Sequence, residues 1–189
     1  MENKSRSLTH PLVGHNITFL QTAAETDGEL LQVEYKVTRP ESGPASIVPP
    51  HVHLHTRERF QVETGTLGLL MDGKKHLLAP GEYVTILPGM PHTFWNAGKG
   101  EVRFLTEIRP AGGFQTYWET VFGLAEAGRA GENGLPDPLL LGVLASCADS
   151  YSADLPLPIA RLAAWFLGAI GRLRGYRVSC APVTRPAAV

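Results

Sequence analysis

Residues 49–65 read PPHVHLHTRERFQVETG, and this stretch governs how the rest of the chain is interpreted. His51, His53 and His55 alternate with other residues, so on an extended strand their side chains point to one face. Glu58 opens a second alternating run and shares its face with Phe60. A carboxylate on an inward, mostly apolar face needs a partner, because burying an unpaired charge is costly. A metal cation shared with the imidazoles is the simplest partner.

A second informative stretch covers residues 81–96 and reads GEYVTILPGMPHTFWN. Pro88-Gly89 marks a turn between two short runs with strand character. His92 follows this turn on a strand that can face the first histidine cluster across a barrel. Alternation places Phe94 on the same side as His92 and Trp95 on the opposite side, so Trp95 is expected to pack on the outer face.

The rest of the first 110 residues has the pattern of short strands. Residues 31–37 alternate apolar and polar side chains, which indicates a strand with one wet face. Asp72-Gly73 predicts a hairpin turn, because both positions tolerate positive φ. Further strands are expected over residues 16–20, 82–87 and 102–108. Short strands separated by turn signals every 8–12 residues or so are typical of a β barrel or sandwich.

The character of the chain changes after Pro110. Helical patterns are expected over residues 114–127, 138–148 and 159–173, with Asp137 as the N-cap of the second helix. We therefore divide the chain into a β domain (1–110), a helical extension (111–175) and a disordered tail (176–189).

The last predicted helix has an apolar stripe that we expect to be committed to packing or to an interface between subunits. The stripe consists of Leu162, Trp165, Phe166, Ala169, Ile170 and Leu173. From Leu155 onward the chain has five arginines and no acidic residue. A solvated helix face explains these arginines most simply, and contact with an anionic surface is the alternative.

The overall composition fits a globular protein. The formal net charge is −1, so no global field favours nucleic acid or an acidic membrane, and neither is expected as a partner. The first ten residues lack the apolar segment of a signal peptide. Cys147 and Cys180 have no metal-type spacing, and although a disulfide is compatible with two cysteines, reduced thiols in a cytoplasmic protein fit better.

The two informative stretches resemble the two motifs of the cupin superfamily, over roughly residues 40–110. The first motif is represented by His51, His53, Glu58 and Gly65, and the second by Gly81, Gly89, His92 and Asn96. One departure is that Pro88 directly precedes the turn glycine, where one residue usually separates the two. The resemblance implies a mainly β fold, the cupin double-stranded β-helix or jelly-roll barrel, here with a C-terminal α-helical extension.

The same resemblance implies one divalent transition metal. Its ligands would be His51, His53, Glu58 and His92. The pair His53 and His55 is the alternative register, but it leaves only two residues before Glu58, and cupin spacing favours the first register. Imidazole ligands suit Fe, Mn, Ni, Cu, Co or Zn, so the sequence does not select the metal.

The remaining candidate residues surround this predicted metal site. The candidate contacts to the ligands or to a substrate are His55, Phe60, Phe94 and Asn96, with an exposed polar side chain as the favoured alternative for His55. Glu58 is also the candidate general base. His10, His15 and His76 show no partner pattern and are expected on the surface or in loops.

For function, the resemblance favours a metal-dependent oxidoreductase of the dioxygenase type acting on a small organic substrate, with aromatic compounds included. The alternatives are a binding or sensing module without turnover and a cupin isomerase or epimerase. The helices are expected to cover the open side of the barrel or to pair across a homodimer. The alternative is that residues 114–127, with Tyr117 and Trp118, form a lid over the pocket.

Overall fold

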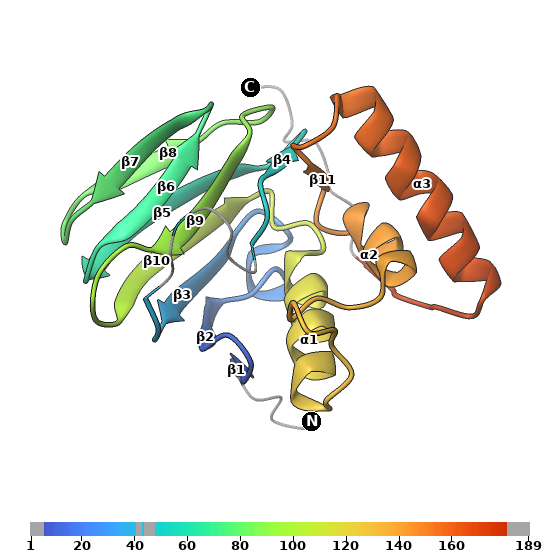
Figure 1. The fold of residues 1–189 in the computed structure, drawn as a ribbon, viewed down its shortest axis with the longest axis horizontal. Coiled ribbons are helices and arrows are strands. Elements are labelled where there is room, and N and C mark those ends of the chain that lie inside the picture. The colour runs from blue at the N-terminus through green and yellow to red at the C-terminus, as the bar shows by residue number, and fades with distance from the viewer. Residues whose placement is uncertain (1–5, 41–42, 44–47, 181–189) are drawn as a thin grey trace.

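The structure is a computed structural model that describes residues 6–40, 43 and 48–180. The β domain consists of two antiparallel sheets (Figure 1). In spatial order, the first sheet contains β1 (Ser7–His10), β2 (His15–Gln21), β3 (Leu31–Val37), β10 (Val102–Arg109), β5 (Arg57–Thr64) and β8 (Tyr83–Ile86). The second contains β11 (Ser150–Ser152), β4 (His51–His53), β9 (His92–Asn96), β6 (Leu67–Met71) and β7 (Lys74–Leu78). A short 3-10 helix, η1 (Ala24–Thr26), precedes β3.

The hydrophobic core lies between the two sheets. In β3 the side chains alternate strictly between buried and half-buried, as the period of two predicts. Val33 from β3, Phe60 from β5 and Leu69 from β6 are almost fully buried in the same cluster. Each sheet therefore contributes one apolar face to a common interior, and the mainly β prediction is confirmed.

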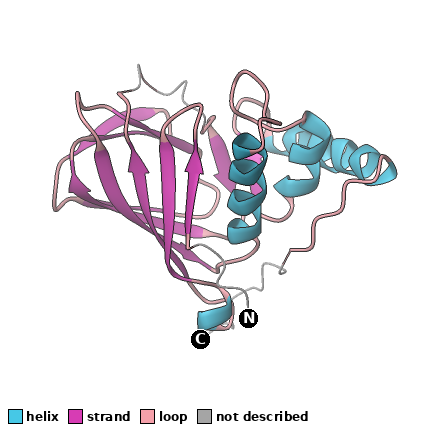
Figure 2. Ribbon diagram, turned by 90° about the horizontal axis from the view of Figure 1, so that it is seen from below, coloured by secondary structure: helices cyan, strands magenta, loops and turns pink. Residues whose placement is uncertain are grey.

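The two sheets do not join into one continuously hydrogen-bonded barrel among the described residues. Strands at the seams are short, with three residues in β4 and four in β8. The Pro88-Gly89 turn lies between β8 and β9, and Gly89 has a φ of 82°. The fold consists of two facing sheets, as the resemblance implies, and Figure 2 shows the helices beside them on one side.

Local turn chemistry agrees with the sequence. Asp72 and Gly73 both have positive φ, 48° and 74°, and connect β6 to β7 as a tight hairpin. At the start of the second α-helix, the Leu139 N–H donates to Asp137 Oδ1 at 2.8 Å, so Asp137 is the predicted N-cap.

Three α-helices follow the β domain: α1 (Phe114–Glu126), α2 (Pro138–Ala145) and α3 (Leu157–Leu173). α1 lies beside the sheets and contacts β1. α2 packs against α3, which lies outermost on the right in Figure 1. In the described ranges, no helix has both the length and the apolar character needed to cross a membrane.

Packing of the apolar stripe within the chain, one of the two expectations for α3, is wrong. The buried residues of α3 are Ala160, Gly168 and Gly171, whereas the predicted apolar stripe, including Trp165 and Phe166, is largely exposed. The reason is backbone packing: a Cβ built on Gly168 would lie 2.8 Å from the carbonyl oxygen of Gly142 in α2. Two helices that approach this closely must meet through residues without side chains.

The C-terminal region is more closely tied to the β domain than the predicted boundaries imply. β11, which was not predicted, pairs with β4 and extends the second sheet. Cys147 and Cys180 form a disulfide, so the expectation of reduced thiols is wrong. The chain after α3 returns to the end of α2 and brings the two Cα atoms to 5.5 Å, within disulfide range.

The tail expected to be disordered begins with a packed segment. Tyr176, Val178 and Cys180 are partly buried against the core cluster. Residues 181–189 of that prediction lie outside the described part of the chain.

Candidate metal centre

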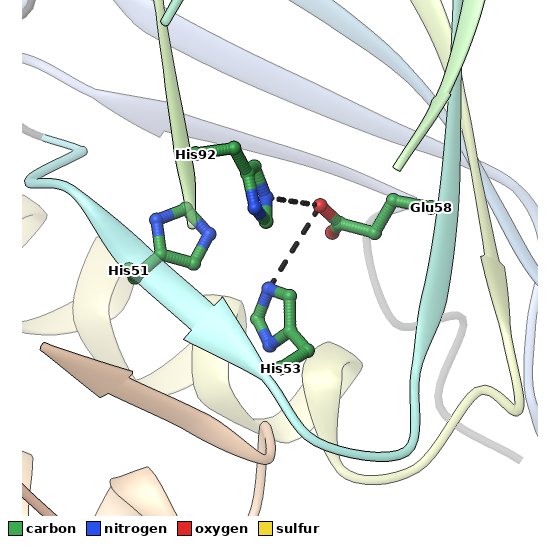
Figure 3. A group of neighbouring side chains, drawn as sticks. All are labelled: His51, His53, Glu58 and His92. Carbon is green, nitrogen blue, oxygen red and sulfur yellow. Dashed lines mark hydrogen bonds and ion pairs between the residues drawn. The ribbon is translucent and has the colours of Figure 1, made fainter. Parts of the chain in front are cut away.

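Four side chains converge between the two sheets (Figure 3). His51 and His53 lie on β4, Glu58 on β5 and His92 on β9. One potential ligand atom from each residue lies within 4.8 Å of the other three. Two ligand atoms on opposite sides of an ion at about 2.1 Å would be about 4.2 Å apart, so the cluster is close to coordination size.

The strands explain why these residues meet. His51 and His92 are partners across the β4–β9 pair, and their ring centroids are 4.2 Å apart. His53 lies two residues further along β4 and so projects from the same face. Glu58 comes from the facing sheet, and its Oε2 lies 2.8 Å from His92 Nε2 and 3.8 Å from His53 Nε2.

The backbone orients all three imidazoles in the same way. The Nδ1–H of His51 donates to the Pro49 carbonyl at 2.9 Å, that of His53 to Asp149 at 3.0 Å, and that of His92 to Met90 at 3.0 Å. Since a carbonyl can only accept, these contacts fix the proton on Nδ1 and turn Nε2 toward the common centre. A ligand imidazole whose second nitrogen donates to a carbonyl is the usual arrangement at protein metal sites.

The cluster is electrostatically set for a cation. Burial lowers the pKa of His51 and of His53, and the neighbouring histidines lower it further, so both rings are neutral ligands near pH 7. Burial alone would raise the pKa of Glu58, but His53 and His92 outweigh it and lower the pKa to about 2. The centre therefore offers a carboxylate from Glu58 and neutral imidazoles from His51 and His53.

Two atoms indicate that the cluster fits a cation. His53 Nε2 is buried and has no hydrogen-bond partner among the described residues. The contact between His92 Nε2 and Glu58 Oε2 needs a shared proton, because His92 Nδ1–H already donates to a carbonyl. A divalent cation would satisfy the lone pair of His53 and replace that proton. The residues present therefore fit a transition metal with three nitrogen ligands and one oxygen ligand.

His55 does not join the cluster. Its side chain is 44% exposed, and its Nδ1 lies 3.3 Å from Asp149 Oδ2. The structure thus brings together the His51 and His53 register and leaves His55 at the rim.

Asp149 is a functional candidate that sequence reasoning missed. Its carboxylate accepts the backbone N–H groups of Leu54 and His55, at 2.8 and 2.6 Å, and its carbonyl accepts from His53. Asp149 therefore positions the chain on which two of the candidate ligands lie. It is 96 residues from His53, and no local spacing in the sequence connects the two.

An apolar cavity of about 100 Å³ lies next to the cluster. Its aromatic lining consists of Tyr35, Phe60, Phe94, Phe114, Tyr117 and Trp118. Three of these rings come from α1, which therefore forms part of the cavity wall. Phe60 and Phe94 occupy the expected positions at the cavity wall.

Apart from the candidate ligands, hydroxyl groups are among the polar groups that line the cavity, including those of Thr106 and Tyr117. Thr106 Oγ1 is buried without a hydrogen-bond partner among the described residues. Burial raises the pKa of Tyr117 to about 12, so its hydroxyl stays protonated and able to donate. No lysine or arginine lines the cavity, and Glu58 is its one carboxylate among the described residues.

Asn96 lies apart from the cavity lining, contrary to expectation. Its Nδ2 donates to the carbonyls of Val37, Arg39 and Gly100, and its Oδ1 accepts the Gly98 N–H. Asn96 therefore ties together two loops at the far end of β9.

Three further aromatic or histidine predictions can be compared with the structure. Trp95 packs over Gly68 on the side of β9 away from the core, as expected. His10 and His15 are fully buried, so the surface prediction is wrong for both. His10 Nε2–H donates to the Gly134 carbonyl, and His15 Nδ1 bonds with the Tyr35 hydroxyl, because tertiary contacts supply partners that the sequence pattern does not show. His76 is exposed on β7.

Comparison with known proteins agrees with this geometry. Residues 41–107 match the family model described as Cupin domain. The chain is 30% identical to quercetin 2,3-dioxygenase of Bacillus subtilis (strain 168) over 83 residues, 44% of this chain and 23% of that protein. It is 36% identical to oxidoreductase OpS7 of Beauveria bassiana (strain ARSEF 2860) over 78 residues, 40% of this chain and 26% of that protein.

The matched region thus spans about a quarter of the length of these two curated relatives. Among solved structures, KdgF from Halomonas sp. is similar, with 18% identity, a TM-score of 0.43, and coverage of 51% of this chain and 79% of that one. Residues 41–107, which include strands of both facing antiparallel sheets, therefore form a cupin domain.

Proposed function

We propose that the protein is a metal-dependent oxidoreductase of the dioxygenase type, acting on a small, uncharged organic substrate. The observation that carries this proposal is the convergence of three imidazole Nε2 atoms and one carboxylate beside an aromatic-lined cavity. Two curated proteins that match part of this chain are a dioxygenase and an oxidoreductase, and this similarity supports the choice of reaction class.

Residues of this chain would serve as metal ligands and as the general base. His51, His53, His92 and Glu58 would hold one divalent transition metal. When bound with open coordination positions, a redox-active metal such as iron or manganese supplies electron transfer between an organic ligand and dioxygen. Glu58 is also the proposed general base, because its carboxylate lines the cavity.

The cavity defines the class of substrate. Aromatic rings favour a planar apolar body, and Tyr117 offers a hydroxyl donor for a carbonyl or hydroxyl oxygen. The absence of lysine and arginine from the described lining disfavours phosphosugars, which the isomerase alternative would require in their usual anionic form.

Metal analysis followed by oxygen uptake tests the proposal. Purified protein is expected to hold iron or manganese near one per chain and to consume oxygen with members of a panel of phenols, diketones and thiols. A protein that holds zinc or nickel and consumes no oxygen would contradict the dioxygenase assignment and favour isomerase or hydrolytic chemistry. A protein that binds panel members without metal would instead be a binding module.

A further inference from the structure

The outward side of α3 presents a row of large apolar side chains to solvent. Their exposed fractions range from 54% to 88% in Ile159, Leu162, Trp165, Phe166 and Leu173. Figure 1 shows α3 at the outer edge of the molecule, at the opposite end from β7. Exposed apolar surface gathered on one face usually marks a site of interaction.

The packing of α3 prevents this face from turning inward. Gly168 and Gly171 lie against α2, where added Cβ atoms would come within 2.8 Å of the Gly142 oxygen and 2.7 Å of the Leu139 oxygen. Any other face of the helix carries side chains too large for that approach. The apolar face is therefore held outward by the fold of the chain itself.

Positive charge borders the apolar face. Arg161 and Arg172 are eleven residues apart, about three helical turns, and so lie along the same edge as Trp165. Arg174 and Arg177 follow at the C-terminal end, and all four arginines are exposed. Across residues 155–180 there is no acidic side chain, and no salt bridge among the described residues engages these arginines.

We propose that α3 docks the protein on an anionic lipid surface, with the helix lying parallel to the membrane plane. The exposed apolar row would enter the headgroup boundary, and the arginines would contact the lipid phosphates. Trp165 is suited to this boundary because its ring is apolar with a polar N–H. The net charge of −1 does not reveal this cationic helix, because it is the sum over a locally cationic segment and an acidic remainder of the chain.

Charge favours a lipid surface over a second copy of the chain. A symmetric dimer places the same patch on both sides of the contact. Two copies joined through α3 would therefore bring their arginines close together, and residues 155–180 offer no carboxylate to pair with them. The apolar row also covers the outer side of a single helix, which allows a flat surface to contact it along its length. The homodimer predicted from the sequence would then use another face.

Vesicle co-sedimentation tests this proposal. The full chain is expected to sediment with phosphatidylcholine vesicles containing about one quarter phosphatidylglycerol, to bind pure phosphatidylcholine weakly, and to dissociate as salt is raised. Arg161→Gln combined with Arg172→Gln should lower the partition constant by about thirtyfold, from about 1 kcal/mol per arginine. Trp165→Ser combined with Phe166→Ser should abolish sedimentation.

Matched controls come from β7, at the far end of the molecule. Lys74→Gln with Lys75→Gln removes two exposed charges there, and Leu77→Ser removes a side chain that is 66% exposed, as Trp165 is. Both control variants should bind vesicles like the original chain. All substitutions are on the surface, and unchanged thermal unfolding would verify that each variant folds.

Several results would overturn the proposal. One is that the original chain does not sediment with anionic vesicles. Another is that the α3 variants bind anionic vesicles as well as the control variants do. A dimer in light scattering that Trp165→Ser with Phe166→Ser dissociates, without vesicle binding, would assign the face to a second copy. Retention on immobilised polyglutamate without vesicle binding would assign it to an acidic protein partner.

Discussion

Glu58 reaches from one sheet to His92 on the other, with 2.8 Å between Oε2 and Nε2. This contact joins two segments that are 34 residues apart and lies at the centre of the candidate metal site. Both residues are buried and the carboxylate is ionised. A cation bound between them would replace the proton that the two side chains share.

Removing one ligand should remove the metal. His92→Ala is expected to lower the metal content at least tenfold while the β domain remains folded, because three ligands hold a transition metal much less tightly than four. His55→Ala is the matched control, since His55 lies on the same segment but outside the cluster. Metal analysis and circular dichroism check this, and equal metal loss in both variants would refute the assigned register.

Asp149 should influence metal affinity without contacting the metal. Asp149→Ala removes the acceptor for two backbone N–H groups next to His53, and we expect about tenfold weaker metal binding. Asp154→Ala removes an exposed carboxylate from the same segment and should leave affinity unchanged. Competition with a chelating dye measures both, and identical affinities for the two variants would show that Asp149 has no positioning role.

Asn96 should be important for stability and not for the metal. Asn96→Ala leaves three buried or partly buried carbonyls without their donor, which should cost about 2 kcal/mol in the free energy of unfolding. Asn133→Ala, at an exposed position, should change it by about 0.5 kcal/mol or less. Denaturant titration gives the comparison; loss of metal at unchanged stability in Asn96→Ala would contradict this role.

The disulfide should stabilise the C-terminal region. Replacing both Cys147 and Cys180 by serine removes a link across 33 residues, and the loss should be about 3 kcal/mol or less. Thermal unfolding with and without reductant measures the effect. The reductant should lower the melting temperature of the original chain and leave that of the double variant unchanged; sensitivity of both would point to another cause.

His10 should make the protein sensitive to acid. Burial lowers the pKa of His10 below 6.5 in the folded state. As the pH falls below 6.5, the imidazole therefore binds a proton in the unfolded chain before it does so in the folded chain. Stability from this residue is therefore present above pH 6.5 and is lost as the pH falls from 6.5 toward the folded-state pKa. In metal-free protein, His10→Gln should reduce the difference in unfolding free energy between about pH 7 and pH 5.5, whereas His76→Gln, at an exposed position, should not. The same pH difference in both variants would exclude His10 as a source.

Patterns within short stretches of sequence predicted several of the strands and, through the resemblance to the cupin motifs, the ligand set of this protein. The alternation at residues 31–37, the turn at Asp72-Gly73 and the cap at Asp137 each involve neighbours in the chain, so local stereochemistry is enough to fix them. The alternation of His51 and His53 follows from the period of a strand, whereas the resemblance to the cupin motifs selected Glu58 and His92 as the other two ligands. The structure brings these four residues together.

Only the tertiary structure decided what depends on partners far away in the chain. Burial of His10 and His15, the support from Asp149, the role of Asn96 and the pairing of Cys147 with Cys180 all arise from contacts between distant segments. The outward turn of α3 is the clearest example. The sequence showed an apolar stripe suited to burial, but the glycines of α2 and α3 allow a closer backbone contact, and this contact leaves the apolar stripe exposed.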